Sequence, residues 1–121
     1  MTGIRADRIE LKGLRAMAVV GVLDHEKLAP QPVEIDLALD VDLRSAGATD
    51  DLVDTVDYGA ITDACMAALT EPAVLLETAA ARLAEVALGD PRVTGVEVAI
   101  RKLRPPVAHD LGTAGVRIFR P

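Results

Sequence analysis

The sequence contains few aromatic residues and only one cysteine. Tyr58 and Phe119 are its only aromatic side chains, and tryptophan is absent. Proteins that bind single-stranded nucleic acid usually stack bases on aromatic side chains, so such a platform is excluded. The formal net charge of −6 also argues against a nucleic-acid partner, because those interfaces depend on clustered lysine and arginine. Cys65 has no second cysteine to pair with, which excludes an internal disulfide and fits a reducing compartment.

Long apolar runs are missing as well. No stretch approaches the roughly 18 apolar residues of a membrane span, so no membrane partner is expected. The segment Met1–Leu14 alternates charged and apolar side chains and lacks the apolar block of a signal peptide, so the expected location is the cytoplasm. The 121 residues are expected to form one domain, residues 1–121. A site in so small a domain is expected in a groove or at a subunit interface.

Alternation of apolar and polar residues predicts a long strand in the first half of the chain. Apolar residues occupy every second position from Val33 to Leu43, with acidic residues at most of the positions between them. A period of two is typical of a half-buried strand. The segment Asp7–Val22 begins with the same alternation and predicts a preceding strand. Between the two strands, Leu23–Pro32 contains two prolines and is predicted to be a loop.

After the long strand, the apolar spacing becomes helical. It predicts one helix over Asp57–Leu69 and a second over Leu75–Leu88. Pro72 separates them, because proline disfavours the helical conformation in the residue before it. The remaining predicted elements are a strand at Val96–Arg101, a loop at Leu103–Thr113 and a strand at Gly115–Arg120.

The resulting order, β-β-α-α-β-β, indicates an α+β fold. Two consecutive helices are expected to cover one face of an antiparallel sheet. A ferredoxin-like domain would instead have the order βαββαβ. A sheet with so long a strand has edges with unpaired backbone N–H and C=O groups. Closure of several subunits into a barrel pairs these groups and removes the edges. Self-association is therefore expected.

Four segments stand in order along the chain: Gly21-Val22-Leu23-Asp24-His25-Glu26, Asp54-Thr55-Val56-Asp57-Tyr58-Gly59, Leu75-Leu76-Glu77-Thr78, and Ile100-Arg101-Lys102 followed by Pro105-Pro106-Val107. Together they resemble the dihydroneopterin aldolase family, over about Asp7 to Phe119. The resemblance implies the tunnelling fold, in which subunits close into a ring-shaped barrel, as a tetramer or as two rings stacked in an octamer.

The resemblance also implies a reaction. It is an aldehyde-lyase step of folate biosynthesis, in which 7,8-dihydroneopterin is split into 6-hydroxymethyl-7,8-dihydropterin and glycolaldehyde. The retro-aldol step is implied to need no metal, no cofactor and no Schiff base, because the pterin ring takes up the electrons of the broken carbon–carbon bond.

Three residues take catalytic roles by this resemblance. Lys102 is implied to move a proton from the substrate's side-chain hydroxyl, and Glu26 to contact both that side chain and the lysine. Tyr58 is implied to stack on the pterin and carry a proton, reaching a site bound mainly to a neighbouring subunit. Without the resemblance, the three residues would be interpreted as a surface lysine, a loop acid and a core or rim aromatic.

Four further residues are implied to bind the substrate. The carboxylate of Glu77 can accept two parallel hydrogen bonds from the amino group and ring N–H of a pterin. Its ordinary interpretation is a solvated acid near a helix N-terminus. Leu76, Val56 and Asp57 are implied to pack around the ring, Val56 through its backbone.

A metal site is not expected. His25-Glu26 begins the pattern H-E-x-x-H, but position 29 is alanine, and no other pair has the spacing of metal ligands.

The sequence departs from the family at Val20, where many members have histidine, and at Ala18, where glycine is frequent. Two alternatives therefore stay open. The first is a dihydroneopterin triphosphate epimerase, which is suggested by Lys102-Leu103, with Arg101, Arg104 and Lys27 as candidates for binding the triphosphate. The second is a non-catalytic pterin-binding module of the same fold.

Overall fold

The computed structural model describes residues 6–121. The beginning of the segment Met1–Leu14, in which the sequence predicts no signal peptide, lies outside these residues. Within the described part of the chain, no helix is long and apolar enough to cross a membrane. The elements are β1 (Arg8–Ala18), α1 (Asp24–Leu28), β2 (Gln31–Asp40), α2 (Arg44–Thr49), the 3-10 helix η1 (Leu52–Asp54), α3 (Tyr58–Ala68), α4 (Leu76–Leu88), β3 (Gly95–Lys102) and β4 (Ala114–Arg120).

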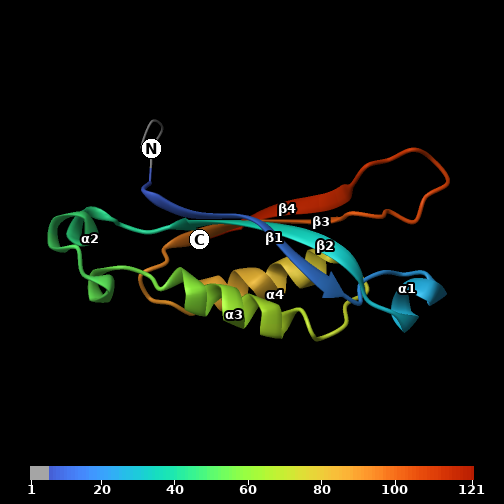
Figure 1. Ribbon diagram of the computed structural model, residues 1–121, viewed down its shortest axis with the longest axis horizontal. Coiled ribbons are helices and arrows are strands. Elements are labelled where there is room, and N and C mark those ends of the chain that lie inside the picture. Colours follow the sequence, from blue (N-terminus) through green and yellow to red (C-terminus); the bar gives the residue numbers. More distant parts are fainter. Residues whose placement is uncertain (1–5) are drawn as a thin grey trace.

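The strands form one four-stranded antiparallel sheet in the order β1-β2-β3-β4. Helices α3 and α4 lie side by side across one face of this sheet (Figure 1). This arrangement confirms the predicted α+β fold with two helices on one face. It also leaves β1 and β4 as the two edges of the sheet within the chain.

The core lies between the sheet and the two helices. Period-two alternation turns the apolar side of each strand toward the helices, so Ile35 pairs with Ile100 and Leu37 with Val98 across β2 and β3. These four side chains are buried. Leu83 on α4 is fully buried, because the apolar stripe of that helix faces the sheet.

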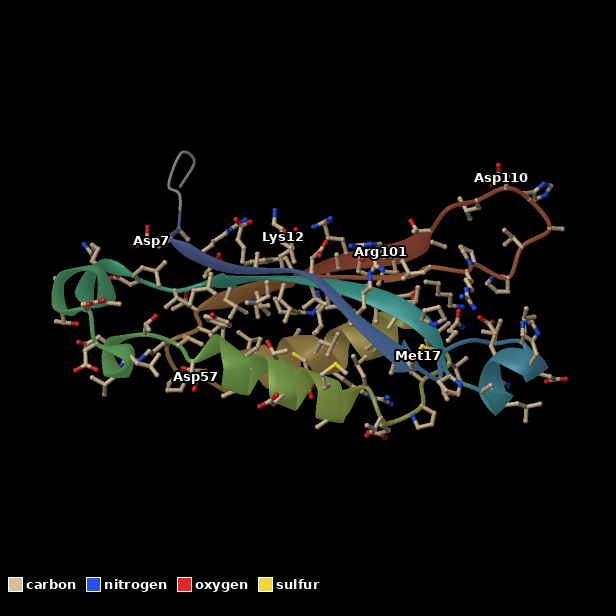
Figure 2. The ribbon with its side chains drawn as sticks, viewed as in Figure 1. Asp7, Lys12, Met17, Asp57, Arg101 and Asp110 are labelled. Carbon is tan, nitrogen blue, oxygen red and sulfur yellow. The ribbon has the colours of Figure 1, made fainter. Side chains whose placement is uncertain are left out.

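The opposite face of the sheet carries ion pairs. Arg101 on β3 donates hydrogen bonds to both Glu34 and Asp36 on β2, and Arg15 on β1 reaches Glu34 at 2.9 Å. Figure 2 shows Arg101 on this face. The hydrogen bonds from Arg101 and Arg15 outweigh partial burial and hold the pKa of Glu34 below its ordinary value. Asp36 also accepts a hydrogen bond of 2.7 Å from the backbone N–H of Gly13, which lies at the bulge in β1.

The main elements follow the predictions, and three predicted segments differ from the structure. The first strand ends at Ala18 rather than Val22. The predicted helices and the last two strands are found within one residue of their expected ends. The predicted loop Leu23–Pro32 is wrong, because it contains α1 and the start of β2. The predicted strand Val33–Leu43 is too long at its C-terminal end, because β2 ends at Asp40. Beyond it the chain turns into α2, and Asp42 accepts hydrogen bonds from the backbone and side chain of Arg44.

Candidate active site

A buried ion pair joins Glu26 and Lys102. Lys102 is the last residue of β3 and lies on the same face as Val98 and Ile100, so its side chain extends from the end of the core. Helix α1 lies at this end of the sheet (Figure 1) and brings Glu26 inward. Nζ of Lys102 lies 2.7 Å from Oε2 of Glu26, and the two side chains are only 13% and 3% exposed. Within residues 6–121, Glu26 is the only buried charged residue.

The Glu26 carboxylate has further hydrogen-bond donors. Gln31 Nε2 donates to Oε2 of Glu26 at 2.9 Å and to the carbonyl oxygen of Val20 at 2.8 Å. The backbone N–H of Leu23 donates a long hydrogen bond of 3.5 Å to Oε1 of Glu26. Burial by itself raises the pKa of Glu26, but the hydrogen bonds from Lys102 and Gln31 and the positive charge of Lys102 together outweigh it. The pKa of Glu26 therefore lies below its ordinary value, and the group is a carboxylate at neutral pH.

A cavity of about 240 Å³ opens beside this ion pair. It adjoins a shallower groove of about 560 Å³, because Met17, Pro32 and Arg104 line both. The smaller cavity falls below the roughly 300–1,000 Å³ of small-molecule sites. The single chain therefore provides an open groove with a charged end rather than an enclosed pocket. The cavity is lined by Met17, His25, Glu26, Ala29, Pro30, Gln31, Pro32, Arg104 and Pro106.

The start of α4 lies at the same end of the molecule. The backbone N–H of Gly21 donates to the carbonyl of Ala73 at 3.2 Å, and the N–H of Ala73 donates to the carbonyl of Val19 at 3.0 Å. This bridge holds the segment before α4 beside the segment that leads into α1. Leu76 is buried, and Glu77 is exposed in the first turn of α4.

The other three predicted site residues stand around the start of α3. Val56 is buried in the core. Asp57 is the N-cap of the helix, and its carboxylate accepts hydrogen bonds from the backbone N–H groups of Gly59 at 3.0 Å and Ala60 at 3.2 Å. Tyr58, the first residue of the helix, is 61% exposed.

The predicted site residues therefore form two groups within one chain. Asp57 and Met17, which borders the cavity beside Glu26, lie toward opposite ends of the molecule (Figure 2). One end holds Glu26, Lys102, Leu76 and Glu77, and the other holds Val56, Asp57 and Tyr58. A single chain does not bring Tyr58 to Lys102.

The structure adds Gln31 to this site and gives Arg104 a position in it that the sequence did not predict. Gln31 opens β2, and no motif marks it, because its importance comes from two tertiary hydrogen bonds. Arg104 appeared only as a candidate for binding a triphosphate, and it lines both cavities. Val20, which departs from the family pattern, is buried in the core. Among the residues described here, no three His, Cys, Asp or Glu side chains gather as a metal site.

Comparisons with known proteins agree with one another. The family model described as dihydroneopterin aldolase matches residues 9–119. The dihydroneopterin aldolase of Streptomyces coelicolor is 37% identical over 115 residues, which cover 94% of this chain and 97% of that protein. That of Streptococcus pyogenes serotype M1 is 33% identical over 116 residues, covering 94% and 98%. The crystal structure of the Escherichia coli dihydroneopterin aldolase in complex with neopterin has a TM-score of 0.87 and 25% identity, covering 95% of this chain and 99% of that one.

Proposed function

The chain belongs to the dihydroneopterin aldolase family, and we propose that it cleaves 7,8-dihydroneopterin into 6-hydroxymethyl-7,8-dihydropterin and glycolaldehyde in folate biosynthesis. The observation that carries the proposal is the buried ion pair of Glu26 and Lys102 beside a cavity. Removing two charges from water costs desolvation free energy, so such a pair is a weak source of stability. Partnered titratable groups in a cleft are typical of catalytic sites.

The reaction needs one proton acceptor and one proton donor. A proton leaves the hydroxyl on the second carbon of the substrate's side chain, and the bond between the first and second carbons breaks. The electron pair of that bond enters the C=N bond of the dihydropterin ring, and glycolaldehyde departs. A proton is then added to the first carbon, which becomes the hydroxymethyl group. The ring takes the place of a lysine Schiff base as the electron acceptor, and the step needs neither a metal nor a cofactor.

We assign the acid–base catalysis to the end of the molecule at which Glu26 and Lys102 meet. Lys102 moves the hydroxyl proton, and Glu26 orients its amino group and contacts the substrate's hydroxyls. Glu77 is exposed at this end, where its carboxylate can accept two parallel hydrogen bonds from the ring. Leu76, buried beside it, gives the ring an apolar neighbour.

We infer that the site is completed by a second subunit. Tyr58 is exposed at the far end of the molecule from Lys102, and the cavity beside Lys102 is open. A neighbouring chain that docks its Tyr58, with Val56 and Asp57, over this cavity would supply the missing wall, the stacking ring and the second proton carrier. Pairing between the edge strands β1 and β4 of successive chains would close a ring, as a tetramer or a stacked octamer. The neopterin complex of the E. coli relative supports a pterin as the ligand.

A product assay tests the proposal. The protein is incubated with 7,8-dihydroneopterin and a chelator, and both products are followed by chromatography, which also separates any epimer of the substrate. We expect both products from the wild type. Lys102→Ala should lose about 10²-fold or more in kcat while still binding neopterin. Lys12→Ala, which removes an exposed lysine from the uncovered sheet face, is the matched control.

Two results would contradict parts of the proposal. A correctly assembled wild type that forms no glycolaldehyde would refute the aldolase function. Borohydride added with the substrate should leave the mass and activity of the enzyme unchanged, and a reduced adduct on Lys102 would establish a Schiff base instead.

A further inference from the structure

We propose that Gly21 is a positioning residue for this reaction, because the space left by its missing side chain is where the Glu26 carboxylate lies. The inference rests on the proposed function, since it assigns to Gly21 the placing of the Glu26–Lys102 pair. Gly21 is not among the residues proposed to contact the substrate. Gly21 acts on the reaction through Glu26.

A side chain at position 21 would collide with Glu26. A Cβ atom at position 21 would lie 2.2 Å from Cδ, 2.3 Å from Oε1 and 2.5 Å from Cβ of Glu26, where real Cβ contacts essentially never fall below 3.0 Å. Because the Cβ of Glu26 is among these atoms, rotating the carboxylate away does not relieve the overlap, and α1 itself must move. Gly21 also has a φ of 154°, a backbone conformation that favours glycine.

Hydrogen bonds hold both Gly21 and Glu26 in place. The N–H of Gly21 donates to the carbonyl of Ala73, within the bridge that holds the segment before α4. On the other side, Glu26 is held by Lys102 at 2.7 Å and by Gln31 at 2.9 Å. A side chain at position 21 would therefore separate the carboxylate from Lys102 or displace α1. Gly21 thus sets the distance between the pterin-anchoring start of α4 and the acid–base pair.

The expected consequence is a loss in the chemical step with little loss in ring binding. A displacement of about 1 Å in a catalytic group can reduce the rate by about 10²-fold. Glu77 and Leu76 are unchanged by the substitution. For Gly21→Ala we expect kcat to fall on the order of 10²-fold, while the Kd for pterin, which lacks the hydroxylated side chain, changes by less than about threefold.

Gly13→Ala provides a matched control. Gly13 also has a positive φ, of 75°, but a Cβ there would meet nothing within 4 Å. Both substitutions strain the backbone, and only Gly21→Ala collides with Glu26. The assembled Gly13→Ala enzyme should keep its kcat within about threefold of the wild type. Equal losses in kcat for the two variants would overturn the inference.

A double-mutant cycle identifies the colliding partner. Glu26→Gly removes all three of the nearest atoms to the added Cβ. Adding Gly21→Ala to that background leaves only the backbone strain at position 21, so the further loss of kcat and of the free energy of unfolding should be clearly smaller than in the wild-type background. A further loss as large as in the wild-type background would overturn the inference.

Two further results are possible: Gly21→Ala does not fold, or the wild type has no aldolase activity. If Gly21→Ala does not fold alone, recovery of the folded oligomer in Gly21→Ala/Glu26→Gly supports the inference, and failure of both to fold overturns it. If the wild type lacks aldolase activity, the proposed function fails, but the cycle in unfolding free energy still tests the contact between Gly21 and Glu26.

Discussion

The amino group of Lys102 lies 2.7 Å from the carboxylate of Glu26, although the two residues are 76 positions apart in the sequence. One residue ends a central strand of the sheet, and the other lies in a five-residue helix beside it. Each charge is removed from water only because the other is present. The contact therefore exists only when the sheet, α1 and the bridge to Ala73 are all in place.

Removing Lys102 should lower the free energy of unfolding, because the buried carboxylate of Glu26 then lacks its cationic partner. The pKa of Glu26 lies below its ordinary 4.5, so the stability that it contributes is present above that pH and is lost as the pH falls further. In Lys102→Met, burial acts without the opposing ammonium group, so the pKa of Glu26 rises. We expect a loss of about 3 kcal/mol in the free energy of unfolding at pH 7. Urea unfolding at one fixed protein concentration measures it.

The pH dependence gives the sharper check on this pair. As the pH falls from 7 to 4, Glu26 takes up a proton first in Lys102→Met, where its pKa is raised, and this proton relieves the cost of burying the carboxylate. In the wild type the pKa of Glu26 is lowered, so the carboxylate stays charged to lower pH. The difference in unfolding free energy between wild type and Lys102→Met should therefore narrow from pH 7 to pH 4. Lys12→Met controls for the loss of a lysine charge. A gap that stays constant or widens on acidification would show that the ion pair does not control this stability.

Mixed oligomers should reveal whether active sites are shared. Lys102→Ala and Tyr58→Ala are each expected to be nearly inactive. Co-expressed in equal amounts, they should regain about a quarter of the wild-type activity, because that fraction of interfaces joins an intact Lys102 to an intact Tyr58.

The control for this experiment is a mixture of Lys102→Ala with Glu26→Ala. These two residues meet within one chain, so no interface in that mixture restores the pair, and activity should stay low. Recovery in the control mixture, or none in the test mixture, would contradict a site shared between Tyr58 and Lys102.

Asp57 has an evident structural role that can be separated from substrate binding. Asp57→Ala removes the N-cap of α3 and should lower the free energy of unfolding by about 1 kcal/mol. Asp57→Asn keeps a side-chain acceptor and should lose only a few tenths of that amount. Thermal unfolding and the product assay are run on both variants. If Asp57→Asn is stable and inactive, the charge of Asp57 acts on the substrate. An Asp57→Ala variant as stable as the wild type would contradict the cap.

Cys65 should be inert in the folded protein. The side chain is fully buried on α3, and burial raises the pKa of its thiol to about 11. Almost no thiolate is therefore present at pH 8, and the thiolate is the reactive form. We expect no reaction with a thiol-specific dye until denaturant is added, when one thiol per chain should react. Rapid labelling of the folded protein would show that this helix opens.

The sequence predicted the regular elements because their patterns extend over several residues. The alternation that ends in Val98, Ile100 and Lys102 places the lysine on the core side of β3. The short elements were missed because they have no room for a period. Helix α1 has five residues, α2 has six and η1 has three. Helix α1 forms where Glu26 turns back toward Lys102 and Gln31, which are tertiary contacts.

The sequence by itself determined the fold class, the faces of the sheet and the family, because periodicity and ordered motifs are local properties of the chain. Only the tertiary structure decided that Glu26 meets Lys102, that Gly21 leaves the space for this contact, and that Tyr58 stands at the opposite end of the molecule. These relationships depend on how distant segments pack against one sheet. No local propensity encodes the distance between residues from different elements.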